Sequence, residues 1–275
     1  MKRRDFISKS IAAGITAGTG FSLLSLEEAF GSIPSNPNAP YDLVAVMGGE
    51  ATEMFEKGIA SLGGMKNFVK PGQTVVVKPN IGWDRVPELG ANTNPELVAK
   101  IIEHCLAAGA KEVFVFDNTC DAWQKAYATS GIEKAAKDAG ATVVSGATES
   151  QYKQVSIPKG KMLKDAKVHN MILNSDVFIN VPVLKHHGGA HVSFAMKNLM
   201  GIVWDRGFWH KNNLQQCIAD MVTYRKPDLN IIDGYRVMKK NGPKGVSASD
   251  VSLEKSQIIS ADIVAADAAA AKIFG

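Results

Sequence analysis

The feature that most constrains the fold is a repeated alternation of short apolar runs with longer amphipathic segments. Residues 73–80 (QTVVVKPN) and 176–183 (DVFINVPV) are apolar runs rich in β-branched residues, which is typical of strands covered on both faces. A clear helix follows the first run, with Asn94 at its cap and Pro95 at its first position. This alternation predicts an α/β fold, a single doubly wound, mostly parallel sheet with helices on both faces.

Size and charge restrict the class of protein further. With 275 residues, 45% of them hydrophobic, the chain can bury one sizeable core, and it shows no internal repeat. We expect one α/β domain over residues 41–275, preceded by a linker at 32–40. The formal net charge of +4 is small and the basic residues are scattered, which argues against nucleic acid as a partner.

The first 31 residues (1–31) are predicted to be a twin-arginine signal peptide rather than part of the fold. Two arginines precede Phe6, a charge-free run extends from Ser10 to Leu26, and Ala29 and Gly31 are the small residues of a cleavage site. We therefore expect a periplasmic or extracytoplasmic protein with no stable membrane insertion after cleavage. The alternative interpretation is an N-terminal amphipathic helix or membrane anchor.

The three cysteines do not form a cluster-binding pattern. Cys105, Cys120 and Cys217 lack the C-x-x-C and ferredoxin spacings, so we expect no iron–sulfur cluster in this chain. Cys105 falls on the apolar side of a helix. Cys120, near a strand end and without an activating partner, is interpreted as a structural thiol. The sequence leaves their disulfide state open.

Polar residues gather where the predicted strands end. Ligands bind beyond the carboxyl ends of the strands in open parallel sheets, so these positions are candidates for one common site. Lys78 and Asn180 are expected to orient a ligand, and Asp233 to act as a base or metal partner. The strand-end candidates are Lys78, Asn80, Asp117, Asn118, Asn180, Lys185, His186, His187 and Asp233.

The stretch after the histidine pair carries the features of an anion site. Gly188 and Gly189 permit backbone amides to approach a ligand, and Ser193 is placed to cap a helix that starts after it. Lys185 and Lys197 supply positive charge. The stretch therefore predicts that a small anionic ligand, such as a phosphate, carboxylate or nucleotide-like group, is held near the start of that helix.

Two other chemistries remain open here. One is a metal ion, although the histidine spacing matches no standard motif and the intervening glycines argue against a helix that would align the rings. The other is a lysine of lowered pKa that acts as nucleophile or base. The candidate metal ligands are His186, His187, His191, His210, Asp117 and Asp233.

Further segments could shape the site. Residues 204–210 (WDRGFWH) hold two of the four tryptophans, as a ligand wall or a core plug. Residues 239–245 (KKNGPKG) form a basic Gly/Pro loop, which is either a lid or an exposed turn. Near the C-terminus, Asp262 is expected to cap a helix, and Asp267 to make a functional contact one turn later.

Several motifs follow one another in the order seen in the DUF362 family, which the chain resembles over about residues 75–275. They are VVVKPN, SDVFINVPVLKHH, FAMKNLMGI, NIIDG, NGP and SADIVAADAAAAKIFG. Some family members are fused to ferredoxin-like modules, so the resemblance implies a link to redox or cofactor metabolism and a redox partner protein. This chain lacks the cluster cysteines of those members. The family-pattern positions are Lys78, Pro79, Asn80, Asn180, Pro182, Lys185, His187, Lys197, Asn198, Asp233, Gly242, Pro243 and Asp267.

Together these features favour an exported enzyme that acts on an anionic ligand, or on an unknown cofactor, at the carboxyl edge of its sheet. Lys185 and Lys197 are expected to grip the ligand, with His187 as the acid–base group or metal ligand. The alternatives are a non-enzymatic ligand or cofactor carrier that uses the same cradle, and an accessory subunit of an iron–sulfur redox system. The sequence specifies neither the substrate nor the reaction.

Overall fold

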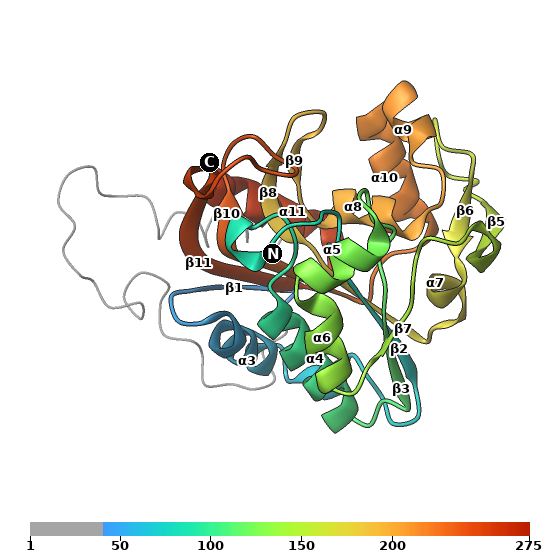
Figure 1. Cartoon of the computed structure of the whole chain (residues 1–275). Helices are drawn as coiled ribbons and strands as arrows, with labels where there is room; N and C mark the ends of the chain where they lie inside the picture. The colour runs from blue at the N-terminus through green and yellow to red at the C-terminus, as the bar shows by residue number, and fades with distance from the viewer. Residues whose placement is uncertain (1–40) are drawn as a thin grey trace. The chain divides into compact units, whose positions relative to one another are not determined.

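The alternation of strands and helices is seen directly in a computed structural model, which describes residues 41–275 (Figure 1). The predicted signal peptide at 1–31 and linker at 32–40 lie outside the described residues. Within the described part of the chain, no helix combines the length and apolar character needed to cross a membrane.

The described elements follow the chain as eleven strands and nine α-helices, joined by short turns and single-turn 3-10 helices. The strands are β1 (Leu43–Met47), β2 (Thr74–Pro79), β3 (Glu112–Val115), β4 (Thr142–Val143), β5 (Tyr152–Ser156), β6 (Asp165–His169), β7 (Val177–Val181), β8 (Val183–His187), β9 (His191–Ser193), β10 (Leu229–Met238) and β11 (Val251–Ser260). The helices are α3 (Ala51–Ser61), α4 (Pro95–Ala107), α5 (Trp123–Thr129), α6 (Ile132–Asp138), α7 (Asn170–Asn174), α8 (Ala195–Asn198), α9 (Gly207–Lys211), α10 (Leu214–Tyr224) and α11 (Ile263–Phe274).

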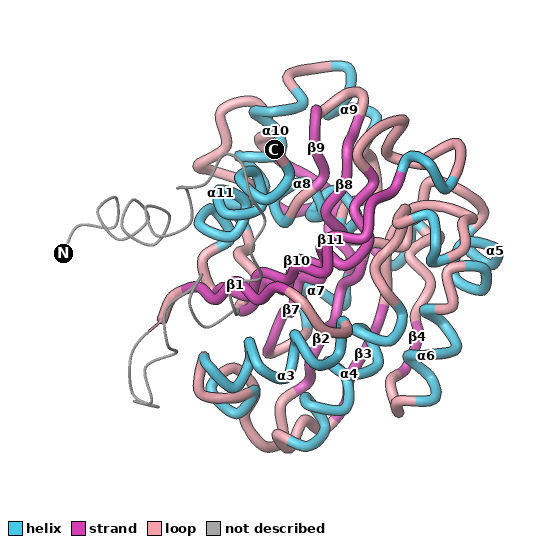
Figure 2. The backbone as a smooth tube through the Cα atoms, turned by 90° about the vertical axis from the view of Figure 1, so that its left-hand side faces the viewer, coloured by secondary structure: helices cyan, strands magenta, loops and turns pink. Residues whose placement is uncertain are grey.

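The main sheet has the strand order β1-β11-β10-β7-β2-β3-β4 (Figure 2). Strands β10, β7, β2, β3 and β4 pair in parallel, whereas β1 and β11 run antiparallel to their neighbours. Strand β8 pairs in parallel with β10 and forms an antiparallel hairpin with β9. The predicted fold class, an α/β fold with a mostly parallel sheet flanked by helices, is confirmed.

Two hydrophobic cores lie on the two faces of the sheet. Side chains alternate across a strand, so Val75 and Val77 of β2 enter one core while Val76 enters the other. Helices α3 and α4 cover the first core, and α10 and α11 cover the second. Helix α4 begins as predicted, because the Asn94 side chain accepts a hydrogen bond from the backbone N–H of Glu96. Strands buried on both faces need this continuous apolar character.

The predicted single strand at 176–183 is two strands, β7 and β8. Pro182 has no N–H to donate to a ladder, and the pairing changes there: β7 lies between β2 and β10, whereas β8 keeps β10 as a partner and no longer pairs with β2. Strand β8 then continues through Lys185 to His187, so the lysine and the histidine pair lie inside a strand rather than in a loop after one. The helix predicted after them is reduced to the single turn of α8 and a 3-10 turn, following β9.

Candidate functional site

A pocket opens at the carboxyl ends of the parallel strands, where the direction of strand addition reverses between β2 and β7. It encloses about 420 Å³, part of which is open to solvent. The ends of β2 and β3, strands β8 and β9, and the segments around α8 and α9 supply its lining. Four cations and one carboxylate line it: Lys78, Lys185, Lys197, Arg206 and Asp117.

A buried ion pair forms the floor of the pocket. The Lys78 ammonium lies 2.8 Å from Oδ1 of Asp117, and the two side chains are 0% and 3% exposed. Lys78 also donates to the carbonyl of Pro79 and to Oδ1 of Asn198, so all three of its N–H donors are used. Burial lowers the pKa of Lys78, and the neighbouring carboxylate opposes that effect. Lys78 therefore holds the pocket together and has no donor left for a ligand.

Three asparagines form a closed amide network beside this pair. Asn198 donates to Oδ1 of Asn180 at 2.8 Å, and its own Oδ1 accepts from Asn80 at 3.0 Å. Asn180 donates in turn to Asn230 and to the carbonyl of Ala195. Asn80 and Asn198 line the pocket, whereas Asn180 is buried behind Asn198, and the side chains of Asn180 and Asn198 form their hydrogen bonds within the protein. Their role is to fix the positions of the lysines.

Lys185 is a buried lysine without a counter-ion in the described residues. Its side chain is 1% exposed, and its ammonium donates to Oδ1 of Asn80 at 3.1 Å and to the carbonyl of Ala91. Residues 41–275 provide no carboxylate in ion-pair contact with it. Burial, assisted by the charge of Lys197, lowers the pKa of Lys185 to about 7. The prediction of a lysine with a lowered pKa is consistent with this environment.

Lys197 and Arg206 complete a cationic wall. Among residues 41–275, the Lys197 ammonium forms a polar contact only with the sulfur of Met200, at 3.2 Å, and burial lowers the pKa of Lys197 to about 8. Arg206 donates to the carbonyls of Asn118 and Thr119, at 2.7 and 2.6 Å. Like Lys185, neither side chain forms an ion pair with a carboxylate of the described chain.

His187 faces the pocket as a neutral ring. Its Nδ1 accepts hydrogen bonds from the backbone N–H groups of Gly189 and Ala190, at 3.0 and 3.1 Å, so the ring proton sits on Nε2. Burial, with Lys197 and Lys185 nearby, lowers its pKa to about 3. A histidine that binds a metal donates its other ring N–H to a partner, whereas this one accepts there. The geometry therefore fits a hydrogen-bond donor and argues against the predicted role as acid–base group or metal ligand.

The other histidines give a metal ion no better site. His186 accepts at Nδ1 from the backbone N–H of Gly242, at 3.1 Å. The rings of His187 and His210 are stacked with centroids 6.4 Å apart. Among residues 41–275, no group of three or more His, Cys, Asp or Glu side chains is arranged to hold a metal ion.

Asp233 does not belong to this pocket. It lies within β10 rather than at a strand end, and it accepts from the backbone N–H groups of Asn94 and Tyr235, at 2.8 and 3.0 Å. It lines a separate, smaller pocket, where burial raises its pKa. The predicted role as a base or metal partner beside Lys185 is thus wrong in position, and Asp233 instead anchors the start of α4.

The predicted anion site at the start of a helix is already occupied by the protein. The Asp267 carboxylate accepts from the N–H groups of Ala195 and Met196, at 2.6 and 3.0 Å, and burial raises its pKa to about 6. Ser193 lines the pocket but does not cap α8, whose N-cap is Phe194. Asp267 is a positioning residue for α8, and its expected contact is with the backbone rather than with a ligand.

The backbone N–H groups of the glycine pair are likewise bonded within the protein. Gly188 and Gly189 form the turn between β8 and β9, where Gly188 N–H donates to the carbonyl of Gly242 and Gly189 N–H donates to His187. Neither glycine lines the pocket. These contacts tie the hairpin to the loop at 239–245 and leave the lysines, rather than backbone amides, to meet an anion.

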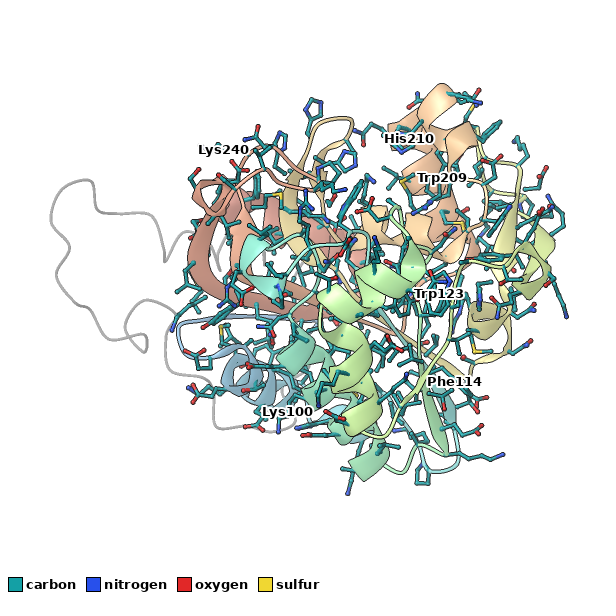
Figure 3. The ribbon with its side chains drawn as sticks, viewed as in Figure 1. Lys100, Phe114, Trp123, Trp209, His210 and Lys240 are labelled. Atoms are coloured by element: carbon teal, nitrogen blue, oxygen red, sulfur yellow. The ribbon has the colours of Figure 1, made fainter. Side chains whose placement is uncertain are left out.

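Several pocket residues escaped the sequence reasoning. Arg206 lies in the segment 204–210, where the sequence pointed to the tryptophans and not to the arginine. Trp209 of this segment is fully buried in the core on α9, next to the exposed His210 (Figure 3). Cys120, expected to be structural, is exposed at the pocket rim with its sulfur 3.5 Å from Arg206. All three cysteines are free. The rule that ligands bind where strands end does not predict the contact between Arg206 and Cys120, because it joins segments far apart in the chain.

The loop at 239–245 closes over one side of the pocket. Pro243 lines the pocket, and the Lys244 ammonium forms an ion pair with Asp121 at 2.9 Å and lies 5.4 Å from the ring centre of Trp83. Trp83 is itself part of the lining. The loop thus connects β10 to the segments that follow β2 and β3, so it is not an isolated exposed turn, and a role as a lid stays a prediction.

Comparison with known proteins places the chain. It is 29% identical over 206 residues to a thylakoid-associated protein of Synechocystis sp., a match that covers 70% of this chain and 61% of that relative. A crystal structure from Thermotoga maritima shares the fold with a TM-score of 0.53 at 13% identity, over 81% of this chain and 58% of the other. The lactate racemase apoprotein of Thermoanaerobacterium thermosaccharolyticum aligns with a TM-score of 0.49 at 12% identity, over 83% and 56% of the two chains.

The chain thus spans about three fifths of the length of the relatives it matches. The family model described as a domain of unknown function, DUF362, matches residues 75–272, which include all five charged residues of the pocket. The chain belongs to the DUF362 family.

Proposed function

We propose that this protein binds a small anionic ligand in the pocket formed by Lys185, Lys197 and Arg206. The observation that carries the proposal is a buried lysine, Lys185, and a half-buried one, Lys197, beside an arginine, with no carboxylate partner for any of them in residues 41–275. Removing a cation from water without a counter-charge is costly, and proteins retain such arrangements where a ligand supplies the missing charge. Lys78 and Asp117 neutralise each other and contribute no charge to this balance.

We further propose that the protein is an enzyme in which Lys185 transfers a proton. A pKa of about 7 lets its amine gain or lose a proton near neutral pH, as an acid–base group requires. His187 would donate a hydrogen bond from Nε2 to the same ligand while remaining neutral. A redox partner protein, implied by the family, would then act on the product of this site. A carrier would use the same cradle without proton transfer.

Isothermal titration calorimetry on the full chain tests anion binding, with acetate and inorganic phosphate as probes. At about pH 8, Lys185 is mostly neutral, and an anion in the pocket raises its pKa toward the ordinary value. Binding should therefore take up protons, which is measured as a dependence of the heat on the ionisation enthalpy of the buffer. We expect this uptake to decrease in Lys185→Met, where Lys197, with its pKa of about 8, still gains part of a proton, and to persist unchanged in Lys134→Met, a change at an exposed lysine of α6.

Two results would overturn the proposal. One is that neither anion binds to the wild-type chain. The other is that binding is unchanged in both Lys185→Met and Lys197→Met. The Lys185→Arg variant separates enzyme from carrier once a substrate is found. It keeps the charge but cannot release a proton, so an enzyme would lose turnover while a carrier would keep its affinity.

A further inference from the structure

The charge balance of the pocket restricts the ligand more narrowly. With the pair of Lys78 and Asp117 set aside, Lys185, Lys197 and Arg206 direct their charges into one small volume. Lys197 lowers the pKa of Lys185, and Arg206 lowers that of Lys197, so the three side chains lie close enough to repel one another. A single negative charge leaves most of this repulsion in place. Two charges on one compact group offset it.

The cationic wall and His187 offer hydrogen-bond donors to a ligand. Within residues 41–275 the Lys197 ammonium contacts a thioether sulfur, Lys185 keeps one N–H beyond its two protein partners, and His187 offers Nε2–H. The asparagine amides beside them are satisfied within the protein. A group with several acceptor oxygens and no donors matches this wall, and phosphoryl groups have that character.

The lining of the same pocket also includes apolar side chains. They are Trp83, Met200 and Pro243, and the sulfur of Met200 contacts the Lys197 ammonium. Trp83 is half-buried, and the Lys244 ammonium lies against its ring. An inorganic ion would leave this surface unused, whereas an ester group attached to the anion would cover it.

Resting on the anion-binding function above, we propose that the ligand is a phosphate monoester. Its dianionic phosphoryl group is held by Lys185, Lys197 and Arg206. Its apolar ester group packs against Trp83 and Met200.

Phenyl phosphate and phenyl sulfate form a matched pair of probes. They share size and shape, but at about pH 8 the phosphate monoester carries two charges, because its second pKa is about 6, and the sulfate carries one. Calorimetry on the full chain should show a preference for phenyl phosphate of about tenfold or more, equivalent to about 1.4 kcal/mol. At about pH 5 both probes are singly charged, and the preference should fall to near parity.

Variants locate the preference in the pocket. Lys197→Gln removes one of the three cations and should reduce the preference at about pH 8 severalfold, while Lys197→Arg retains it. Lys134→Gln, which removes an exposed charge on α6, serves as the control and should not change it. Circular dichroism melts of each variant verify that the fold is retained, and Arg206→Gln provides a second test if Lys197→Gln does not fold.

The outcomes distinguish this inference from the function on which it rests. Equal affinity for the two probes at about pH 8 would overturn the dianion inference but leave anion binding intact, provided that acetate or benzoate still binds. A preference unaltered in both Lys197→Gln and Arg206→Gln would also overturn it. Tighter binding of inorganic phosphate than of phenyl phosphate would refute the ester part. If no anion binds, the proposed function itself fails.

Discussion

Replacing Lys78 by methionine tests the ion pair on which the pocket is built. Methionine keeps a similar volume but removes the ammonium, which leaves the Asp117 carboxylate 3% exposed and without its cation, 2.8 Å from where that charge was. Asp117 retains one hydrogen bond, from the backbone N–H of Ile81 at 2.7 Å. Removing one partner of a buried pair costs about 3–5 kcal/mol, because a buried charge is left uncompensated. We therefore expect Lys78→Met to lower the free energy of unfolding by about that amount.

Urea denaturation at neutral pH, followed by circular dichroism, measures this loss. The double variant Lys78→Met with Asp117→Asn removes both charges and should recover a large part of it, since replacing a buried pair by neutral groups is often close to neutral in stability. Lys134→Met, which breaks an exposed pair with Asp138, should change stability by less than about 1 kcal/mol. A loss of under about 1 kcal/mol in Lys78→Met, or a double variant as unstable as the sum of the singles, would refute the reasoning.

Three further predictions concern single positions. The pKa of Lys185 is lowered from 10.5 to about 7 on folding, so the unfolded chain binds more protons than the folded chain between these pH values. The free energy of unfolding should therefore rise with pH across that window, by up to about 1.4 kcal/mol per pH unit. Urea titrations at several pH values should show that Lys185→Met removes this part of the pH dependence. Gly201→Ala would place a Cβ 1.9 Å from Oδ1 of Asp117 and should cost about 1–3 kcal/mol in thermal melts, whereas Gly188→Ala, with no atom nearer than 3.8 Å, should cost clearly less; equal losses would contradict the packing argument. Burial raises the pKa of Asp267 to about 6, so the folded chain binds more protons than the unfolded chain between about pH 4 and pH 6, and the wild type should gain stability as the pH falls through that window. Asp267→Asn cannot take up this proton and keeps only one acceptor oxygen for the two N–H groups at the start of α8, so urea unfolding should show its stability relative to the wild type decreasing from about pH 7 to about pH 5; a difference independent of pH would count against the reasoning.

The location of the candidate site could be read from the sequence, but its composition could not. Apolar runs end at Lys78 and just before Asp117, and parallel strands bring their carboxyl ends to one edge, so these residues had to meet. The same argument placed Asp233 wrongly, because β10 continues beyond Asp233 and pairs there with β11. The short NIIDG motif does not indicate that the strand continues. Arg206 reaches the pocket from a loop whose sequence resembles any polar connection.

The sequence by itself determined the architecture, since the apolar period of Val75, Val76 and Val77 assigns each side chain to one of two cores, and periodicity is a local property. Only the tertiary structure decided which polar groups form hydrogen bonds or ion pairs within the protein and which remain available to bind a ligand. Asp267 and Lys185 are both charged residues in the family pattern, yet the carboxylate finds two backbone N–H groups on α8 while the lysine is buried without a counter-ion in the described chain. That distinction depends on partners distant in sequence, because a hydrogen bond or ion pair exists only where folding brings its two members together.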